Sequence, residues 1–256
     1  MNNVTRYPIL VFVISFFVLW LSVKIGVFFR RRRPKLEEEI SGEDLGLIQA
    51  AALTLLGLII GFSFSMAVGR YDQRKNYEEA EANAIGTEYA RADLLPAAGA
   101  AKVRALLRDY LDQRVLFYVT RDGQKIREIN ARTAQLQTEL WSAVQAPATA
   151  QPTPMVALAV SGMNDVLNSQ GYTQAAWWNR IPIAAWGLMA AISICSNMLV
   201  GYGTRNVKAE GILLLVLPLL VSIAFFLIAD IDSPRGGVIR VHPQNIESLV
   251  ESLHAH

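Results

Sequence analysis

Four long apolar runs dominate the pattern of hydrophobic and polar positions along the chain. Each has roughly the 20 residues that an α-helix needs to cross the hydrocarbon core of a bilayer. The pattern predicts membrane-spanning helices at residues 8–29, 45–68, 181–202 and 211–229. The 256-residue chain has too little other sequence to bury four such helices inside a soluble protein. The predicted fold class is therefore all-α, a polytopic membrane protein.

The sequence between the second and third runs shows helical periodicity and no β pattern. The second span is predicted to continue beyond the membrane as a helix. Breaks in the periodicity fall at Pro96, at Asp122 and Gly123, at residues 146–154, and near Gly171. The predicted parts are spans 1 and 2 (1–68), a helical extramembrane domain (69–180), spans 3 and 4 (181–231) and a C-terminal tail (232–256).

The composition agrees with a membrane protein and argues against several classes of function. The chain is 52% hydrophobic with a formal net charge of +2, so bulk charge gives no reason to expect nucleic-acid binding. The single cysteine, Cys195, cannot form an intrachain disulfide, and the His, Cys, Asp and Glu spacings match no zinc site. No phosphate-binding loop, nucleophile elbow or metalloprotease motif occurs. We therefore expect no enzyme activity, no cofactor and no metal.

Basic residues next to the spans predict the orientation in the membrane. The first span is followed by RRRRPK at residues 30–35, and the loop after the third span carries Arg205 and Lys208. The opposite face carries as many basic residues, but in less dense groups. Because basic loops are retained in the cytoplasm, both termini and the middle domain are predicted to be extracytoplasmic. We expect membrane lipid as a partner, and the reverse orientation stays open.

The second span carries the most informative surface. Small residues recur there at every fourth position, namely Gly57, Gly61, Ser65 and Gly69. Such a stripe lets helix backbones approach closely in a membrane, so helix packing is the simpler interpretation. The alternative is that this face lines a polar path. In the third span Ser193, Ser196 and Asn197 cluster on one side, which indicates contact with protein or water rather than lipid.

Two groups of acidic residues follow apolar runs. Asp230 and Asp232 end the fourth span, where they could cap a helix, pair with a basic residue such as Arg70, or belong to an ion path. The second span is followed by Glu78, Glu79, Glu81 and Glu88. For these four we expect a solvated helix face, with cation binding as the alternative.

Two stretches carry a resemblance to a known family. They are GFSFSMAVGRYDQRKNYEEAEANAIGTEYARADLL at residues 61–95 and DIDSPRGGVIRVHPQNIESL at residues 230–249. The chain resembles the bacterial bestrophin-like family of unknown function, over nearly its whole length. Both stretches also resemble true bestrophins: the helix after the second span has Arg70 and Arg74 around an aromatic residue, and a Pro-x-Gly turn and Pro243 follow the fourth span.

The resemblance implies a pentameric anion channel whose second span lines the pore. It marks Gly61, Phe62, Phe64 and Ser65 as pore-neck positions. Basic residues beyond that span would attract anions, here Arg70, Arg74 and Lys75. The chain departs from the family in lacking the acidic calcium-binding run after the fourth span. Its two phenylalanines point in different directions on a helix, and bestrophins keep the middle domain in the cytoplasm.

Two functional hypotheses follow. The first is a homo-oligomeric, bestrophin-like ion channel that conducts anions, based on the small and polar face of the second span. The second is a non-conducting membrane scaffold or sensor, because the middle domain exceeds what a simple pore requires. Its protein partner is unknown from the sequence.

Overall fold

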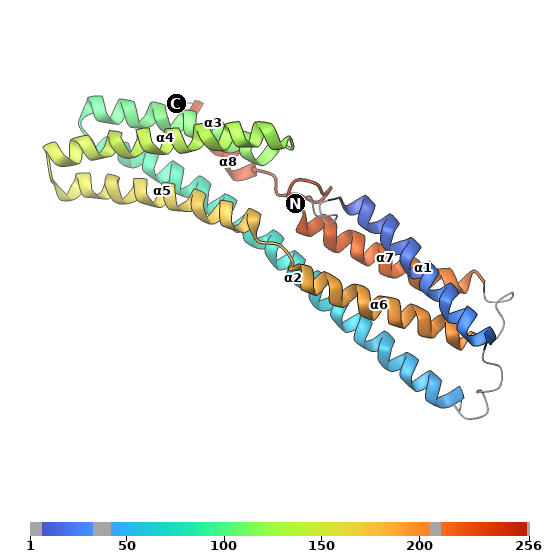
Figure 1. Cartoon of the computed structure of the whole chain (residues 1–256). Helices are drawn as coiled ribbons and strands as arrows, with labels where there is room; N and C mark the ends of the chain where they lie inside the picture. Colours follow the sequence, from blue (N-terminus) through green and yellow to red (C-terminus); the bar gives the residue numbers. More distant parts are fainter. Residues whose placement is uncertain (1–6, 33–41, 205–210, 255–256) are drawn as a thin grey trace. The chain divides into compact units, whose positions relative to one another are not determined.

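The structure is a computed structural model that describes residues 7–32, 42–204 and 211–254, and these residues contain no strand. The basic residues Arg33, Lys35, Arg205 and Lys208, on which the orientation depends, lie outside the described residues. Figure 1 shows the helices α1 (Pro8–Arg32), α2 (Gly42–Arg91), η2 (Ala92–Leu94), α3 (Ala97–Val119), α4 (Gly123–Ala150), α5 (Pro154–Trp178), α6 (Ile183–Gly203), α7 (Leu213–Asp232) and α8 (Gln244–His254). The predicted all-α fold is confirmed.

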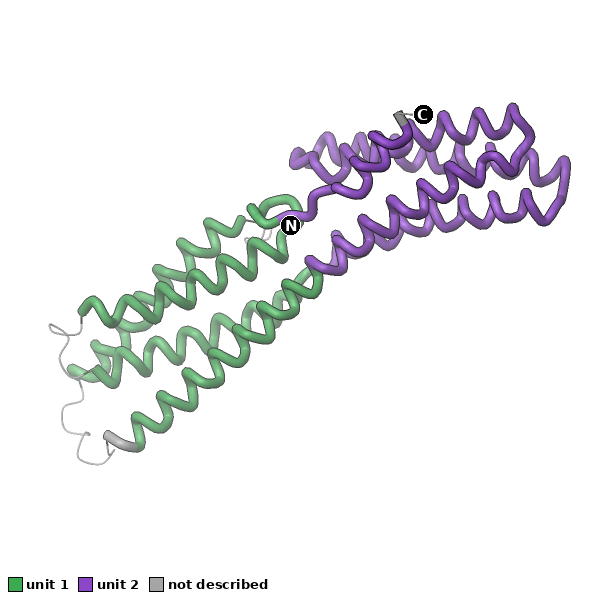
Figure 2. Tube along the Cα trace, turned by 180° about the vertical axis from the view of Figure 1, so that it is seen from behind, with its two compact units in different colours: residues 1–70, 180–239 green, residues 71–179, 240–256 purple. Residues whose placement is uncertain are grey.

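The chain forms two compact units (Figure 2). Unit 1 comprises Met1–Arg70 and Arg180–Ile239, and unit 2 comprises Tyr71–Asn179 and Arg240–His256. Among the described residues, four helices are long and apolar enough to cross a membrane, which confirms the four predicted spans. The tail that was predicted as one segment is divided between the units, because its last helix, α8, packs with α3 in unit 2.

Unit 1 depends on a close crossing between α1 and α6. A Cβ atom added at Gly26 would overlap the backbone oxygen of Met198, and one added at Gly201 would overlap that of Val23. These two glycines therefore let the helix backbones touch, which supplies van der Waals attraction where lipid removes the hydrophobic driving force. α7 packs against the same helix, α1.

Unit 2 is a helical bundle with its own apolar core. Side chains from three helices have no exposed surface, among them Leu107, Leu136 and Met163. Two polar caps fix where helices begin. The Asp122 carboxylate accepts hydrogen bonds from the backbone N–H groups of Gln124 (2.6 Å) and Lys125, and the Thr153 hydroxyl accepts one from Val156.

The structure shortens one predicted break in unit 2 and removes another. The predicted loop at residues 146–154 is present only at residues 151–153. α4 runs through Pro147 to Ala150, because this stretch is rich in alanine, the best helix former, and the Pro147 ring fits against the bare backbone of Gly99 on α3. α5 runs through Gly171 to Trp178. One internal glycine costs only about 1 kcal/mol relative to alanine, and the buried residues Thr173 and Trp177 hold the last turns in place.

Candidate functional site

The membrane half of α2, the predicted span at residues 45–68, is left largely uncovered by its own chain. Only 6% of its most apolar window is buried, compared with 28% in α1 and 44% in α7. The residues of this half that are buried are Leu56, Ser63 and Ala67, which share one narrow strip. Beside this strip the hydroxyl of Ser196 on α6 donates a hydrogen bond to the Ala52 carbonyl oxygen (3.3 Å).

The small-residue stripe lies on the opposite side of the same helix. At about 100° per residue, Ser65 points roughly 180° away from the mean direction of the buried strip. A Cβ atom added at Gly57, Gly61 or Gly69 would meet no described side chain or neighbouring helix within 4 Å. The stripe therefore makes no helix contact within the described residues, which leave it open to other molecules or water.

The two phenylalanines flank the stripe on different sides. Phe62 is 61% exposed and Phe64 is 41% exposed. Because they are two positions apart, their directions differ by roughly 160° on a helix. One α2 helix therefore cannot present both rings to the same narrow point.

The polar residues of the third span face the interior of unit 1. Ser193, Ser196 and Asn197 on α6 are all buried, and the Asn197 side-chain amide donates a hydrogen bond to the Ser193 carbonyl oxygen (2.8 Å). The structure places them together in the interior of unit 1. It does not bring them to the small-residue stripe of α2.

The three basic residues at the end of the span differ in their surroundings. The Arg70 guanidinium lies 3.5 Å from an Asp232 carboxylate oxygen and its side chain is 17% exposed. Arg74 is buried and its Nε donates to the Ala176 carbonyl oxygen (3.4 Å). Lys75 is exposed. Arg74 therefore serves the interior of unit 2, and of the three only Lys75 is an exposed residue.

The two aspartates at the end of α7 hold backbone groups of unit 1. Both carboxylate oxygens of Asp232 accept from the Ile181 N–H at 3.2 Å, just before α6 begins. The Asp230 oxygens accept from the N–H groups of Val238 and Ile239, each at 2.8 Å. These contacts give both acids a structural role at the end of the span.

The expectation of a solvated acidic face on α2 is wrong for three of its four members. Glu78, Glu81 and Glu88 are buried, and only Glu79 is exposed. The buried residues alternate at three and four positions with Ile85 and Ala92, which is the spacing of a buried helix face. That spacing was visible in the sequence, but glutamate is so rarely buried that its chemical type concealed it.

Glu78 and Glu81 are well supplied with hydrogen-bond donors. Glu78 accepts from the backbone N–H groups of Asn245 (2.9 Å) and Ile246 (3.0 Å), so a carboxylate occupies the positive end of α8. Glu81 forms a fully buried ion pair with Arg114 and also accepts from the hydroxyls of Tyr118 and Thr173, each at 3.1 Å. Burial, and next the nearby Glu81 carboxylate, raise the pKa of the Tyr118 hydroxyl.

Glu88 has no such donors. Its side chain is fully buried, and within the described part of the chain neither carboxylate oxygen has a hydrogen-bond partner. Burial raises the pKa of this carboxyl from 4.5 to about 8. Arg91 opposes this shift and Asp165 adds to it. The group is therefore mostly protonated at neutral pH.

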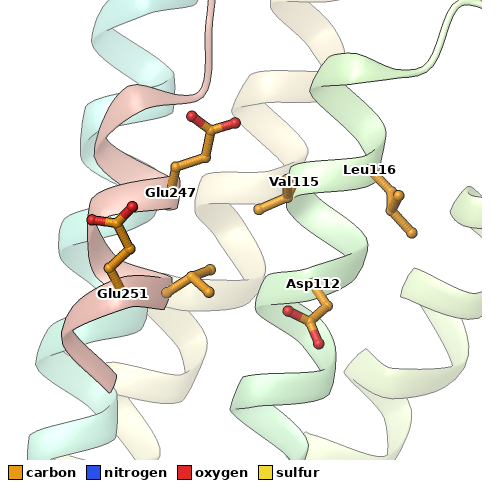
Figure 3. A pocket seen from close by; sticks show the side chains of 6 residues that line it. Asp112, Val115, Leu116, Glu247 and Glu251 are labelled. Atoms are coloured by element: carbon orange, nitrogen blue, oxygen red, sulfur yellow. The ribbon is translucent and has the colours of Figure 1, made fainter. Parts of the chain in front are cut away.

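A groove on unit 2 lies between α3 and α8 (Figure 3). It encloses about 460 Å³ and its walls carry the carboxylates of Asp112, Glu247 and Glu251 beside the apolar Val115 and Leu116. Its acidic and apolar lining suits a segment that combines basic and apolar side chains.

Among the described residues no group of three His, Cys, Asp or Glu side chains could hold a metal ion.

Comparisons with known proteins identify the family and the fold. The chain matches the model of the bestrophin-like domain over residues 15–246. Two crystal structures of a bacterial bestrophin homologue from Klebsiella pneumoniae, one of them carrying a single substitution, superpose with a TM-score of 0.65. They share 13% and 12% identity with the chain, cover 95% of it, and are themselves covered over 97% and 98% of their lengths. No curated protein matches. Since the family model spans nearly the whole sequence, the chain belongs to the bestrophin-like family.

Proposed function

We propose that the chain is one subunit of a homo-oligomeric ion channel in which copies of α2 surround the conduction path. The observation that carries the proposal is the uncovered stripe of small and polar residues on α2, centred opposite its buried strip. A span needs its polar surface to face protein or water. Membership of the bestrophin-like family supports the same assignment.

Symmetric copies of one chain can satisfy this requirement. Neighbouring α2 helices would cover the flanks of the stripe, and its centre at Gly61 and Ser65 would face water. A ring of identical contacts closes when the rotation between copies divides a full turn. The resemblance to bestrophins favours five copies, and the family is the sole basis for that number.

Anion selectivity rests on the family resemblance more than on the geometry. Arg70 pairs with Asp232, and Arg74 contacts the Ala176 carbonyl oxygen inside unit 2. Lys75 is exposed and remains the best candidate for attracting anions, with a smaller contribution from the partly exposed Arg70.

The family resemblance supports a location in a bacterial inner membrane with unit 2 inside the cytoplasm. The distribution of basic residues supports the opposite orientation, with unit 2 outside. Gln124, at the exposed start of α4, offers a test. In a Cys195→Ala background, Gln124→Cys should react with an impermeant thiol reagent in intact cells with a permeable outer envelope. Labelling only after lysis would reverse the assignment.

Currents through the purified protein in planar bilayers test the channel proposal. We expect conductance with reversal potentials that follow the chloride gradient rather than the sodium gradient. Gly61→Ala should change the conductance and leave the oligomer unaltered by size-exclusion chromatography with light scattering, because the added methyl group would face water. A folded oligomer that carries no current in several salts would exclude the proposal.

The groove between α3 and α8 favours a second candidate function, a membrane scaffold that binds a basic and apolar peptide segment. An immobilised library of such peptides should then bind the wild-type protein, and Glu247→Lys together with Glu251→Lys should abolish binding. A non-conducting oligomer that binds such peptides through the groove would favour the scaffold over the channel.

A further inference from the structure

We propose that Glu88 is a proton-binding site of unit 2, and that loss of its proton loosens the contact between α2 and α5 and thereby alters conduction. The second part rests on the proposed function. The site is defined by a fully buried carboxyl without hydrogen-bond donors, at a point where α5 presents only the backbone of Gly162.

The Glu88 carboxyl lies so close to the backbone of α5 that no ligand larger than a proton fits between them. A Cβ atom added at Gly162 would overlap the Glu88 carboxylate and lie 2.7 Å from an Arg91 guanidinium nitrogen. The carboxyl therefore already fills the space against the Gly162 backbone of α5. Burying such a group without hydrogen-bond partners costs far less when the group is neutral than when it is charged.

The charged groups that act on Glu88 come from both packed helices. Arg91 on α2 favours the carboxylate, and Asp165 on α5 disfavours it. Neither oxygen of Glu88 accepts a hydrogen bond from Arg91. Once ionised, Glu88 would have to gain donors from water, and this requires the two helices to separate locally.

Glu81 shows that the same helix face can hold a charged carboxylate when donors are present. It lies two turns before Glu88 and receives hydrogen bonds from Arg114, Tyr118 and Thr173. The missing donors thus distinguish Glu88 from Glu81, whose carboxylate accepts several hydrogen bonds. Because α2 is one continuous helix from Gly42 to Arg91, a change in its packing at Glu88 acts on the element that forms the proposed path.

The sign of the pH effect follows from the direction of the shift. Unfolded chains lose this proton near pH 4.5, whereas the folded protein keeps it until about pH 8. Between these values the unfolded state binds fewer protons, so stability falls as the pH rises, and the loss is complete above about pH 8. Glu88→Gln copies the protonated shape and removes this dependence.

Unfolding temperatures of wild type and Glu88→Gln across this pH range test the proton site. The variant should be the more stable one, by a margin that grows up to about pH 8 and is constant beyond it. Asp165→Asn should lower the pH at which the margin levels off, because it removes a negative neighbour. The exposed Glu79→Gln should follow wild type at every pH. Equal pH dependence in wild type and Glu88→Gln would overturn the proposal.

Currents measured over the same pH range test the regulatory part. Wild-type current should change with a midpoint near pH 8, and Glu88→Gln should hold one level throughout. The same pH-dependent current in both proteins would refute regulation through Glu88, even if the unfolding temperatures behave as expected. If neither protein conducts, the proposed function fails and regulation fails with it, while the unfolding temperatures still decide whether Glu88 holds a proton.

Discussion

The two halves of α2 are covered to very different degrees by their own chain. In unit 2 the helix buries a continuous face that includes Arg74, Glu81 and Ile85. In the membrane half only a narrow strip is buried, and the opposite side carries Gly61 and Ser65 without any described neighbour. The same helix is thus a core element in one unit and an open surface in the other.

This difference indicates where the missing partners of α2 must come from. In unit 2 the chain supplies ion pairs and apolar contacts, so the fold there can be complete in one copy. In the membrane half no described segment covers the stripe, so its packing depends on other copies, lipid or water. Substitutions should therefore affect the folding of one copy in unit 2, and assembly or conduction in the membrane half.

The largest effect is expected where α2 is most deeply buried. Glu81→Gln would leave the Arg114 guanidinium buried and without its opposite charge, which typically costs about 3–5 kcal/mol. Thermal unfolding in detergent should show this loss. The matched change Glu79→Gln, two positions away on the exposed side, should stay within about 0.5 kcal/mol of wild type. Similar losses in both variants would contradict the burial of Glu81.

A smaller effect is expected where two spans touch. Gly201→Leu forces a side chain into the backbone of α1 at Val23, and overpacking of this kind costs about 1–3 kcal/mol. Gly61→Leu has open space around it, so it should leave the unfolding temperature of the separated subunit unchanged and alter the oligomer or its current. Light scattering and thermal unfolding of both variants measure the contrast. Equal destabilisation by the two would mean that the stripe is packed within the chain.

The smallest effect on stability is expected at Lys75, on α2 beyond the end of the stripe. Lys75→Glu removes the one exposed cation of these three basic residues and should change stability by no more than about 0.5 kcal/mol. It should nevertheless shift the reversal potential in a chloride gradient towards lower anion selectivity. Arg74→Glu, at a buried position, should destabilise unit 2 instead. An unchanged reversal potential for Lys75→Glu would remove this residue from the conduction path.

Much of the fold could be predicted because length and hydropathy decide it. The four spans depend on runs of apolar residues, and neither charge pairing nor side-chain detail alters that requirement. The ends of the helices within unit 2 were harder to predict from the sequence. The continuation of α4 past Pro147 depends on a contact with Gly99 on another helix, and no local pattern reveals that contact.

The candidate site was only partly visible in the sequence. The small-residue stripe follows from its spacing, but its direction, away from the chain's own helices, required the structure. The close crossing of α1 and α6 uses Gly26 and Gly201, single glycines without a repeat to mark them. The roles of Glu81 and Glu88 differ because of donors on α3 and α5, and sequence neighbours of the two glutamates carry no sign of that difference.

The central claim, that the uncovered face of α2 lines a conduction path, is tested most directly by a pair of serines. Ser65 lies on the open stripe and Ser63 in the buried strip of the same helix. Each is changed to cysteine in a Cys195→Ala background, and the current is recorded while a charged thiol reagent is added. We predict that the reagent reduces the current of Ser65→Cys and leaves that of Ser63→Cys unchanged. A steady current through Ser65→Cys, or equal block of both, would contradict the account.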